Sequence, residues 1–251
     1  MSDAMDDEFD TLAGWTADAV DELGPEYAIP AGCRGSGGPA ALGWLLEHLA
    51  VTASDRMLDA GAGVGGPAAF AVQRTGVTVV LAEPEPEACR AARHLYDLEA
   101  VVAPGQDLPF GDDAFDVAWS LAVLCTTEDK DALLGELHRV LAPAGRLGLL
   151  VYVRTTDDLS GGPEGNVFPS DDELAQLLDG AGFDVTGRQD VSDLPPDDEQ
   201  WTQRGDAIDD VLERRHGDDA AWQTAQRQTE AFGGLLSDGR VMGRLVTAAR
   251  R

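Results

Sequence analysis

Positive charge is scarce in this chain of 251 residues. Lysine and arginine together number 18 against 46 aspartate and glutamate residues, the net charge is −28, and Lys130 is the only lysine. A surface this acidic repels phosphate backbones and anionic lipid headgroups, which disfavours nucleic acid and membranes as partners. Because acidic clusters fall in almost every expected loop, a solvated, salt-tolerant surface is favoured over an electrostatic funnel for a cationic substrate.

Cysteine and histidine are also few. Cys33, Cys89 and Cys125 are far apart in the sequence, and the four histidines are scattered. The chain therefore has neither the paired cysteines of a zinc site nor the dense cysteine framework of a small disulfide-stabilised domain. We expect no metal site.

Long apolar runs are absent. No stretch approaches the roughly 20 apolar residues of a membrane-spanning helix. The segment Met1–Asp10 is acidic, whereas a signal peptide is basic and then apolar. Hydrophobic residues make up 43% of the chain, as in globular proteins. These features predict a cytoplasmic protein that folds as one α/β domain with elaborations.

The most informative segment that is present is 57–67, which reads Met-Leu-Asp-Ala-Gly-Ala-Gly-Val-Gly-Gly-Pro. A short apolar strand ends at Asp59, then Gly61, Gly63 and Gly65 alternate through a tight turn, and an Ala-rich stretch predicts a helix. Glycines at such a turn let the backbone bend sharply and a ligand approach closely. The free N–H groups at the start of the helix face that ligand. The segment therefore predicts a nucleotide-binding loop.

The glycine spacing fits two classes of enzyme, because Gly61, Gly63 and Gly66 also satisfy the dinucleotide fingerprint. A second expected strand ends in Glu83, 22 residues past Gly61. A carboxylate at that position binds ribose hydroxyls in NAD(P)-dependent oxidoreductases and in methyltransferases alike. On these residues both classes stay open.

A later segment separates them. Residues 108–117 read Leu-Pro-Phe-Gly-Asp-Asp-Ala-Phe-Asp-Val, and at this point the chain resembles the class I S-adenosylmethionine-dependent methyltransferases, in particular the branch that acts on small molecules. The resemblance covers roughly residues 55–192 and the last strand, residues 243–249. It implies a Rossmann-like, doubly wound α/β fold with a seven-stranded, mostly parallel sheet and an antiparallel last strand.

The resemblance also implies the cofactor and its binding residues. S-adenosyl-L-methionine is expected over the carboxyl ends of the first, second and fourth strands, with S-adenosyl-L-homocysteine as the product. The expected contacts come from the glycine loop, the acid expected to bind ribose and the residue after it, the loop after the third strand and the end of the fourth strand. They are Asp59, Gly61, Ala62, Gly63, Gly65, Glu83, Pro84, Gln106, Asp107, Ser120 and Leu121.

One position departs from the family. Members typically have an Asp four residues before the leucine of the Leu108-Pro109-Phe110 segment, where it hydrogen-bonds the adenine amino group, and this chain has Pro104 there. Either Gln106 or Asp107 replaces it, or adenine is held by backbone groups and stacking alone.

Two segments around the core are expected to build the substrate site. Residues 1–52 are predicted to form an N-terminal helical cap or lid on a methyltransferase core spanning 53–251. Residues 192–240 are predicted to form a helical insertion between the last two strands, at a place where such enzymes add a lid or an oligomer contact. A homodimer is therefore one expected assembly.

Four side chains in these segments are expected to contact the cofactor or the substrate. Arg34 suits the methionine carboxylate of the cofactor because guanidinium pairs well with that group, and Tyr27 is expected to close over cofactor or substrate. Trp201 and Trp222 are expected to contact substrate. The alternatives are a surface arginine, a packed tyrosine and core tryptophans.

No catalytic residue is assigned. Methyl transfer is a displacement with a good leaving group, so alignment in a water-poor site supplies much of the acceleration. Relatives often have histidine where Cys125 and Thr126 stand, and without it an amine, a thiol or an already acidic hydroxyl is the easier acceptor. Cys125 is either a substrate contact or a packed thiol.

These features predict an S-adenosylmethionine-dependent methyltransferase with a small-molecule acceptor. The alternatives are an NAD(P)-dependent oxidoreductase and a methyltransferase-like protein that binds the cofactor without catalysis. Tyr96 and Tyr152 have no lysine four residues further on, which counts against the oxidoreductase.

Overall fold

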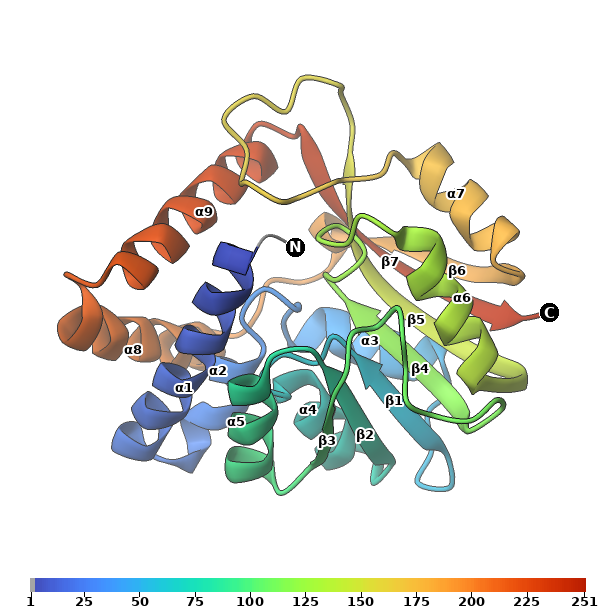
Figure 1. The fold of residues 1–251 in the computed structure, drawn as a ribbon, viewed down its shortest axis with the longest axis horizontal. Helices are drawn as coiled ribbons and strands as arrows, with labels where there is room; N and C mark the ends of the chain where they lie inside the picture. Colours follow the sequence, from blue (N-terminus) through green and yellow to red (C-terminus); the bar gives the residue numbers. More distant parts are fainter. Residues whose placement is uncertain (1–2) are drawn as a thin grey trace.

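Seven strands form one sheet in the order β3-β2-β1-β4-β5-β7-β6 (Figure 1). The structure is a computed structural model that describes the backbone of residues 3–251 and the side chains of residues 9–251. The strands are β1 (Arg56–Ala60), β2 (Thr78–Glu83), β3 (Glu99–Val102), β4 (Phe115–Leu121), β5 (Leu141–Arg154), β6 (Phe183–Asp190) and β7 (Val241–Arg250).

All neighbouring pairs from β3 to β5 are parallel, whereas β7 runs antiparallel to both β5 and β6. The predicted doubly wound α/β fold with a seven-stranded sheet and an antiparallel last strand is confirmed. Strand β5 begins at Leu141, which pairs with Phe115, and the regular ladder with β4 starts after a register irregularity at Arg146.

Helices bury both faces of the sheet. Successive residues of a strand point to opposite faces, so Met57 packs with one layer and Leu58 with the other. The Met57 layer contains α3 (Pro39–His48), α4 (Gly66–Thr75) and α5 (Pro86–Tyr96). The Leu58 layer contains α6 (Lys130–Val140) and α7 (Asp171–Gly180), and α7 begins with a capping box of Ser170 and Glu173.

A third layer is built from both peripheral segments. We call α1 (Asp3–Leu23), α2 (Ala28–Gly32), α8 (Glu199–His216) and α9 (Ala220–Ser237) the helical cap; a short 3-10 helix (Pro25–Tyr27) joins α1 to α2, and another (Val191–Asp193) precedes α8. The cap helices share a core and lie together on the left of Figure 1. Its buried members are Ala19, Val20, Ala28, Ala31, Ile208, Val211, Leu212 and Trp222.

Polar contacts join the two halves of the helical cap. Glu22 of α1 pairs with Arg214 of α8 at 2.5 Å and also with Arg215. The Trp15 ring stacks on His216 with ring centres 3.7 Å apart. Within residues 3–251, no helix combines the length and the apolar composition needed to cross a bilayer.

The helical cap meets the core at two glycines. Gly32 ends α2 and Gly66 begins α4, and a Cβ placed on Gly66 would lie 2.2 Å from the backbone carbonyl carbon of Gly32. Because both neighbours are backbone, the contact cannot adjust by rotating a side chain. Glycine at residue 66 is therefore required for the cap to reach the start of α4.

We expect Gly66→Ala to lower the free energy of unfolding by about 1–3 kcal/mol, since the added methyl group overpacks this contact. Gly43→Ala is the matched control: Gly43 lies in α3 with no atom within 4 Å of an added Cβ, so the better helix former should raise stability by about 0.5–1 kcal/mol. Urea denaturation of the three proteins measures both effects. Equal stability of Gly66→Ala and the parent would contradict the proposed tight contact.

Candidate functional site

The loop between β1 and α4 lies at the carboxyl edge of the parallel strands. Gly61, Gly63 and Gly65 have φ angles of 77°, 53° and 86°, in the left-handed region that glycine adopts without steric cost. The Gly61 and Ala62 N–H groups donate to the Ala82 carbonyl at 2.8 and 3.4 Å. The loop is thereby held against the end of β2.

Glu83 ends β2 beside this loop and is only 7% exposed. One carboxylate oxygen accepts the Gly63 N–H at 2.7 Å, and the other accepts the Glu85 N–H at 3.3 Å. Burial raises the pKa of Glu83, these two hydrogen bonds oppose the rise, and the nearby Asp10 carboxylate adds to it. Since a carboxylate has about four acceptor sites, each oxygen keeps capacity for a ligand hydroxyl.

Asp59 lies one residue before the end of β1 and is 1% exposed. Its Oδ2 atom has no hydrogen-bond partner among residues 9–251. Burial raises the pKa of Asp59 to about 7. The nearby Trp119 indole, whose N–H forms no hydrogen bond among residues 9–251, opposes this rise, and the Glu83 carboxylate increases it. A buried carboxyl with a vacant oxygen gains most from a cationic or N–H donor.

Helix α1 lies across this edge. The Asp10 carboxylate accepts the Glu87 N–H at the start of α5 with a distance of 2.7 Å, next to the segment that follows Glu83. The carboxyl edge therefore holds two buried acids and a glycine loop under one helix of the cap. Such a site suits a ligand that carries both vicinal hydroxyls and a cationic group.

The loop after β3 places the two adenine candidates differently. Gln106 is half-buried and donates from Nε2 to the Thr127 hydroxyl at 2.6 Å, whereas Asp107 is exposed. Pro104 lies in the turn and its carbonyl accepts the Asp107 N–H at 3.1 Å. Gln106 is therefore the one that the structure connects to the loop after β4.

Ser120 differs from the expected cofactor contact. It is fully buried, and its hydroxyl donates to the Ala60 carbonyl at 2.9 Å, so its side chain joins β4 to β1 and exposes no surface to a ligand. Leu121 follows at the end of β4 and is 4% exposed. Pro84 is half-buried in the turn between β2 and α5.

Four expected ligand contacts have protein partners instead. Arg34 pairs with Asp209 of α8 at 2.7 Å, and Tyr27 packs against the cap core. Trp201 lies edge-on to Phe70 of α4 with ring centres 6.5 Å apart. Trp222 is 1% exposed, and its ring N–H donates to Glu213. Trp201 thus packs α8 against α4 and Trp222 joins α9 to α8, while their expected contacts with substrate stay predictions.

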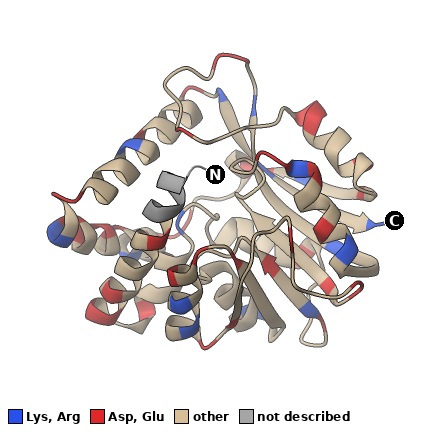
Figure 2. Cartoon of the chain, in the orientation of Figure 1, with Lys and Arg blue, Asp and Glu red and all other residues tan. Residues whose placement is uncertain are grey.

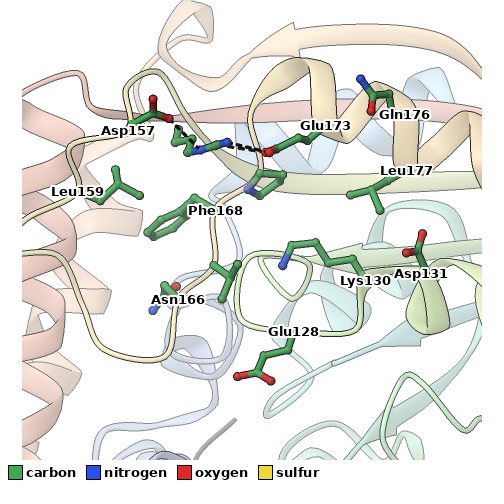
Figure 3. A pocket seen from close by; sticks show the side chains of 13 residues that line it. Glu128, Lys130, Asp131, Asp157, Leu159, Asn166, Phe168, Glu173, Gln176 and Leu177 are labelled. Atoms are coloured by element: carbon green, nitrogen blue, oxygen red, sulfur yellow. Dashed lines mark hydrogen bonds and ion pairs between the residues drawn. The ribbon is translucent and has the colours of Figure 1, made fainter.

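A cavity of about 670 Å³ lies at the ends of β4 and β5 (Figure 3). Its walls come from the loop after β4, the loop after β5 and the starts of α6 and α7. The residues that line it are Glu128, Lys130, Asp131, Arg154, Asp157, Leu159, Asn166, Val167, Phe168, Pro169, Glu173, Gln176 and Leu177.

Cys125 lies behind this cavity. It is 2% exposed, its thiol donates to the Ala122 carbonyl at 3.1 Å, and burial raises its pKa to about 11. It packs in an aromatic cluster in which Phe232 of α9 meets Tyr152 at 4.7 Å and Phe168 at 6.0 Å between ring centres. Cys125 is thus a neutral, packed thiol next to the cavity.

No short sequence pattern marks Lys130 or Phe168 as part of a cavity. Lys130 is the only lysine of the chain, and that rarity is the one indication in the sequence. Phe168 carries no such indication. Their shared cavity depends on two loops that are far apart in sequence.

Comparisons with known proteins agree with the geometry of the edge. A family described as a methyltransferase domain matches residues 58–149. The chain is 33% identical over 166 residues to the methyltransferase GfsG of Streptomyces halstedii. The match covers 59% of this chain and 60% of GfsG. It is 30% identical over 217 residues to the 27-O-demethylrifamycin SV methyltransferase of Amycolatopsis mediterranei, with 79% of each chain covered.

A solved structure is similar in fold. The geranyl diphosphate C-methyltransferase of Streptomyces coelicolor A3(2), in complex with Mg²⁺, geranyl-S-thiolodiphosphate and S-adenosyl-L-homocysteine, has a TM-score of 0.63 at 19% identity. The match covers 84% of this chain and 76% of that one. None of these similarities favours the NAD(P)-dependent oxidoreductase.

The raised pKa of Asp59 makes the stability of the free protein depend on pH. Its folded pKa of about 7 exceeds the unfolded value of about 3.9, so the folded state binds an extra proton between these values and stability falls as pH rises from 4 to 7. Asp59→Asn should remove this part of the slope and be more stable than the parent at pH 8, by at most about 4 kcal/mol.

Urea denaturation at pH 5 and pH 8 measures that difference. Asp18→Asn, which removes an exposed acid of α1, is the control and should keep the parental slope. A parallel pH dependence of Asp59→Asn and the parent would show that Asp59 is ionised throughout this range.

Proposed function

This chain belongs to the class I S-adenosylmethionine-dependent methyltransferases, and from that premise we propose that it methylates a small-molecule acceptor at the ends of β4 and β5. The observation that carries the proposal is the hydrogen bond between Glu83 and the Gly63 N–H. This bond holds Glu83, the acid expected to bind ribose, and the glycine loop together at the carboxyl edge, where open α/β sheets bind their ligands.

The residues of this edge fit the cofactor. Glu83 is proposed to accept the ribose hydroxyls with the acceptor sites that its two N–H partners leave vacant. Asp59 is proposed to face the cationic methionine end, since its Oδ2 is buried without a partner among residues 9–251. The backbone of Gly61, Ala62, Gly63 and Gly65 is proposed to line the cofactor between them.

For adenine we propose Gln106 over Asp107. Gln106 is half-buried and fixed by its bond to Thr127, which leaves its amide oxygen to accept from an amino group. Asp107 is exposed, so a hydrogen bond from it would compete with water. Pro84 and Leu121 are proposed to contribute apolar surface beside the cofactor.

When bound, S-adenosyl-L-methionine supplies an electrophilic methyl group on a sulfonium centre. The protein is proposed to align the acceptor with that centre and to exclude water from it, because positioning supplies much of the rate in such a displacement. The buried thiol of Cys125 and the buried phenol of Tyr152 have pKa values raised to about 11 and about 12. Both stay protonated at neutral pH, so neither takes a proton from the acceptor.

A small molecule fits as acceptor better than a polymer with a phosphate backbone. Acidic residues are spread over helices and loops in the cartoon of Figure 2 among fewer basic ones, and the net charge is −28. A relative that covers 79% of this chain is named for 27-O-demethylrifamycin SV, a small molecule. The cavity of about 670 Å³ is within the range that encloses drug-sized ligands.

Titration calorimetry tests the cofactor site. We expect the parent protein to bind S-adenosylmethionine and S-adenosylhomocysteine and not NAD(H), and Glu83→Ala to bind both sulfur compounds at least tenfold more weakly, because a buried acceptor for two hydroxyls is lost. Glu47→Gln, which removes an exposed acid of α3, should bind like the parent.

Two results would overturn the assignment. Tight NAD(H) binding without either sulfur compound would favour an oxidoreductase. Unchanged affinity in Glu83→Ala would place the ribose elsewhere. Release of S-adenosylhomocysteine with a panel of phenol, amine and carboxylate acceptors then separates a catalyst from a protein that only binds the cofactor.

A further inference from the structure

Lys130 is a buried cation without a carboxylate partner. It is 8% exposed at the start of α6, and its Nζ donates to the Thr127 carbonyl at 2.5 Å. Its amine is absent from the ion pairs formed among residues 9–251. An ammonium group has three donors, so two of them are available to a ligand. Such a placement is costly unless a partner arrives.

The other charges of the cavity do not neutralise Lys130. Arg154 is paired with Glu173 at 2.8 Å and with Asp157 at 3.9 Å. Glu128, Asp131, Asp157 and Glu173 are all exposed, so their fields are screened by solvent and salt. The inner wall therefore carries one uncompensated positive charge, and the negative charge lies at the rim.

Apart from the half-buried Asn166, the rest of the inner wall is apolar. Phe168 is 5% exposed, Pro169 is buried, and Leu159 and Leu177 are half-buried. Figure 3 shows the amine end of Lys130 directed toward the side of the cavity where Phe168 and Asn166 lie. A ligand that fills this space needs an apolar body and one group that complements an ammonium.

We propose that this cavity binds the methyl acceptor, and that the acceptor is an apolar, ring-bearing compound whose anionic oxygen, a carboxylate or an ionised hydroxyl, pairs with Lys130. The position of the acceptor rests on the proposed function. Lys130 is then a specificity-determining residue: it selects the anionic form over neutral analogues of the same shape, because the neutral analogue leaves the ammonium buried and unpaired.

Two further observations agree. Burial lowers the pKa of Lys130, and the carboxylates of Glu128 and Glu173 act against this. An anionic ligand would add to their effect at close range. The cavity also lies beside the loop that carries Thr127, whose hydroxyl accepts a hydrogen bond from Gln106. The same loop therefore lies between a ligand at Lys130 and the proposed adenine site at Gln106.

The single lysine makes the test direct. Protein labelled with ¹³Cε-lysine gives one side-chain signal, which belongs to Lys130. We expect naphthalene-2-carboxylate to shift this signal saturably, and 2-naphthamide, which has the same rings and no charge, to leave it unchanged. Benzoate and anthracene-2-carboxylate, as smaller and larger carboxylates, cover the size range of the cavity.

Variants measured by calorimetry separate charge from packing. Lys130→Met should bind naphthalene-2-carboxylate roughly tenfold or more weakly, whereas Lys130→Arg, which keeps the charge, should stay within about threefold of the parent. Arg90→Gln, which removes an exposed cation of α5, is the control and should bind like the parent.

Each outcome decides the proposal. No shift of the lysine signal with any of the three carboxylates, an equal shift with 2-naphthamide, or an equal loss in Lys130→Met and Arg90→Gln would overturn it. All titrations are run with and without S-adenosylhomocysteine. If the cofactor binds normally and the Lys130 signal does not shift with any carboxylate, this inference alone is rejected. If the cofactor does not bind, the proposed function is rejected, and the shift of the Lys130 signal still decides whether the cavity binds carboxylates.

Discussion

The hydrogen bond from the Gly63 N–H to Glu83 is the contact on which the rest of the site depends. It joins the loop after β1 to the end of β2 at 2.7 Å, and it places a buried acid beside a loop whose glycines adopt left-handed φ angles without steric cost. Asp59 lies on the adjacent strand with a vacant oxygen. This bond fixes the Glu83 carboxylate beside the glycine loop, which two N–H bonds from Gly61 and Ala62 to the Ala82 carbonyl also hold against the end of β2.

The helical cap extends this constraint to segments far from the core motif. Residues of α1 and α2 share one apolar core with α8 and α9, although the two pairs are separated by more than half of the chain. The backbone contact between Gly32 and Gly66 then sets the distance from the cap to the glycine loop. Packing in the cap and ligand access at the edge are therefore linked through one close approach of two backbones.

The few basic side chains of the chain lie at specific contacts. Several arginines form ion pairs that join elements, for example Arg34 with α8 and Arg154 with α7. The one lysine is buried beside a cavity and bonded to a backbone carbonyl. Burial protects this charge from part of the solvent screening that weakens surface charges.

The sequence by itself determined the features that short segments encode. The glycine loop, the acid at the end of β2, the capping box of α7 and the alternation of strands and helices all follow from residues a few positions apart, and the structure contains each of them. Only the tertiary structure decided the surroundings of Trp222, Arg34 and Lys130. These depend on which distant element lies opposite the side chain: Glu213 and the cap core for the tryptophan, Asp209 for the arginine, and the loop after β5 for the lysine. Local patterns carry no information about such partners, because packing between segments far apart in the chain brings them together.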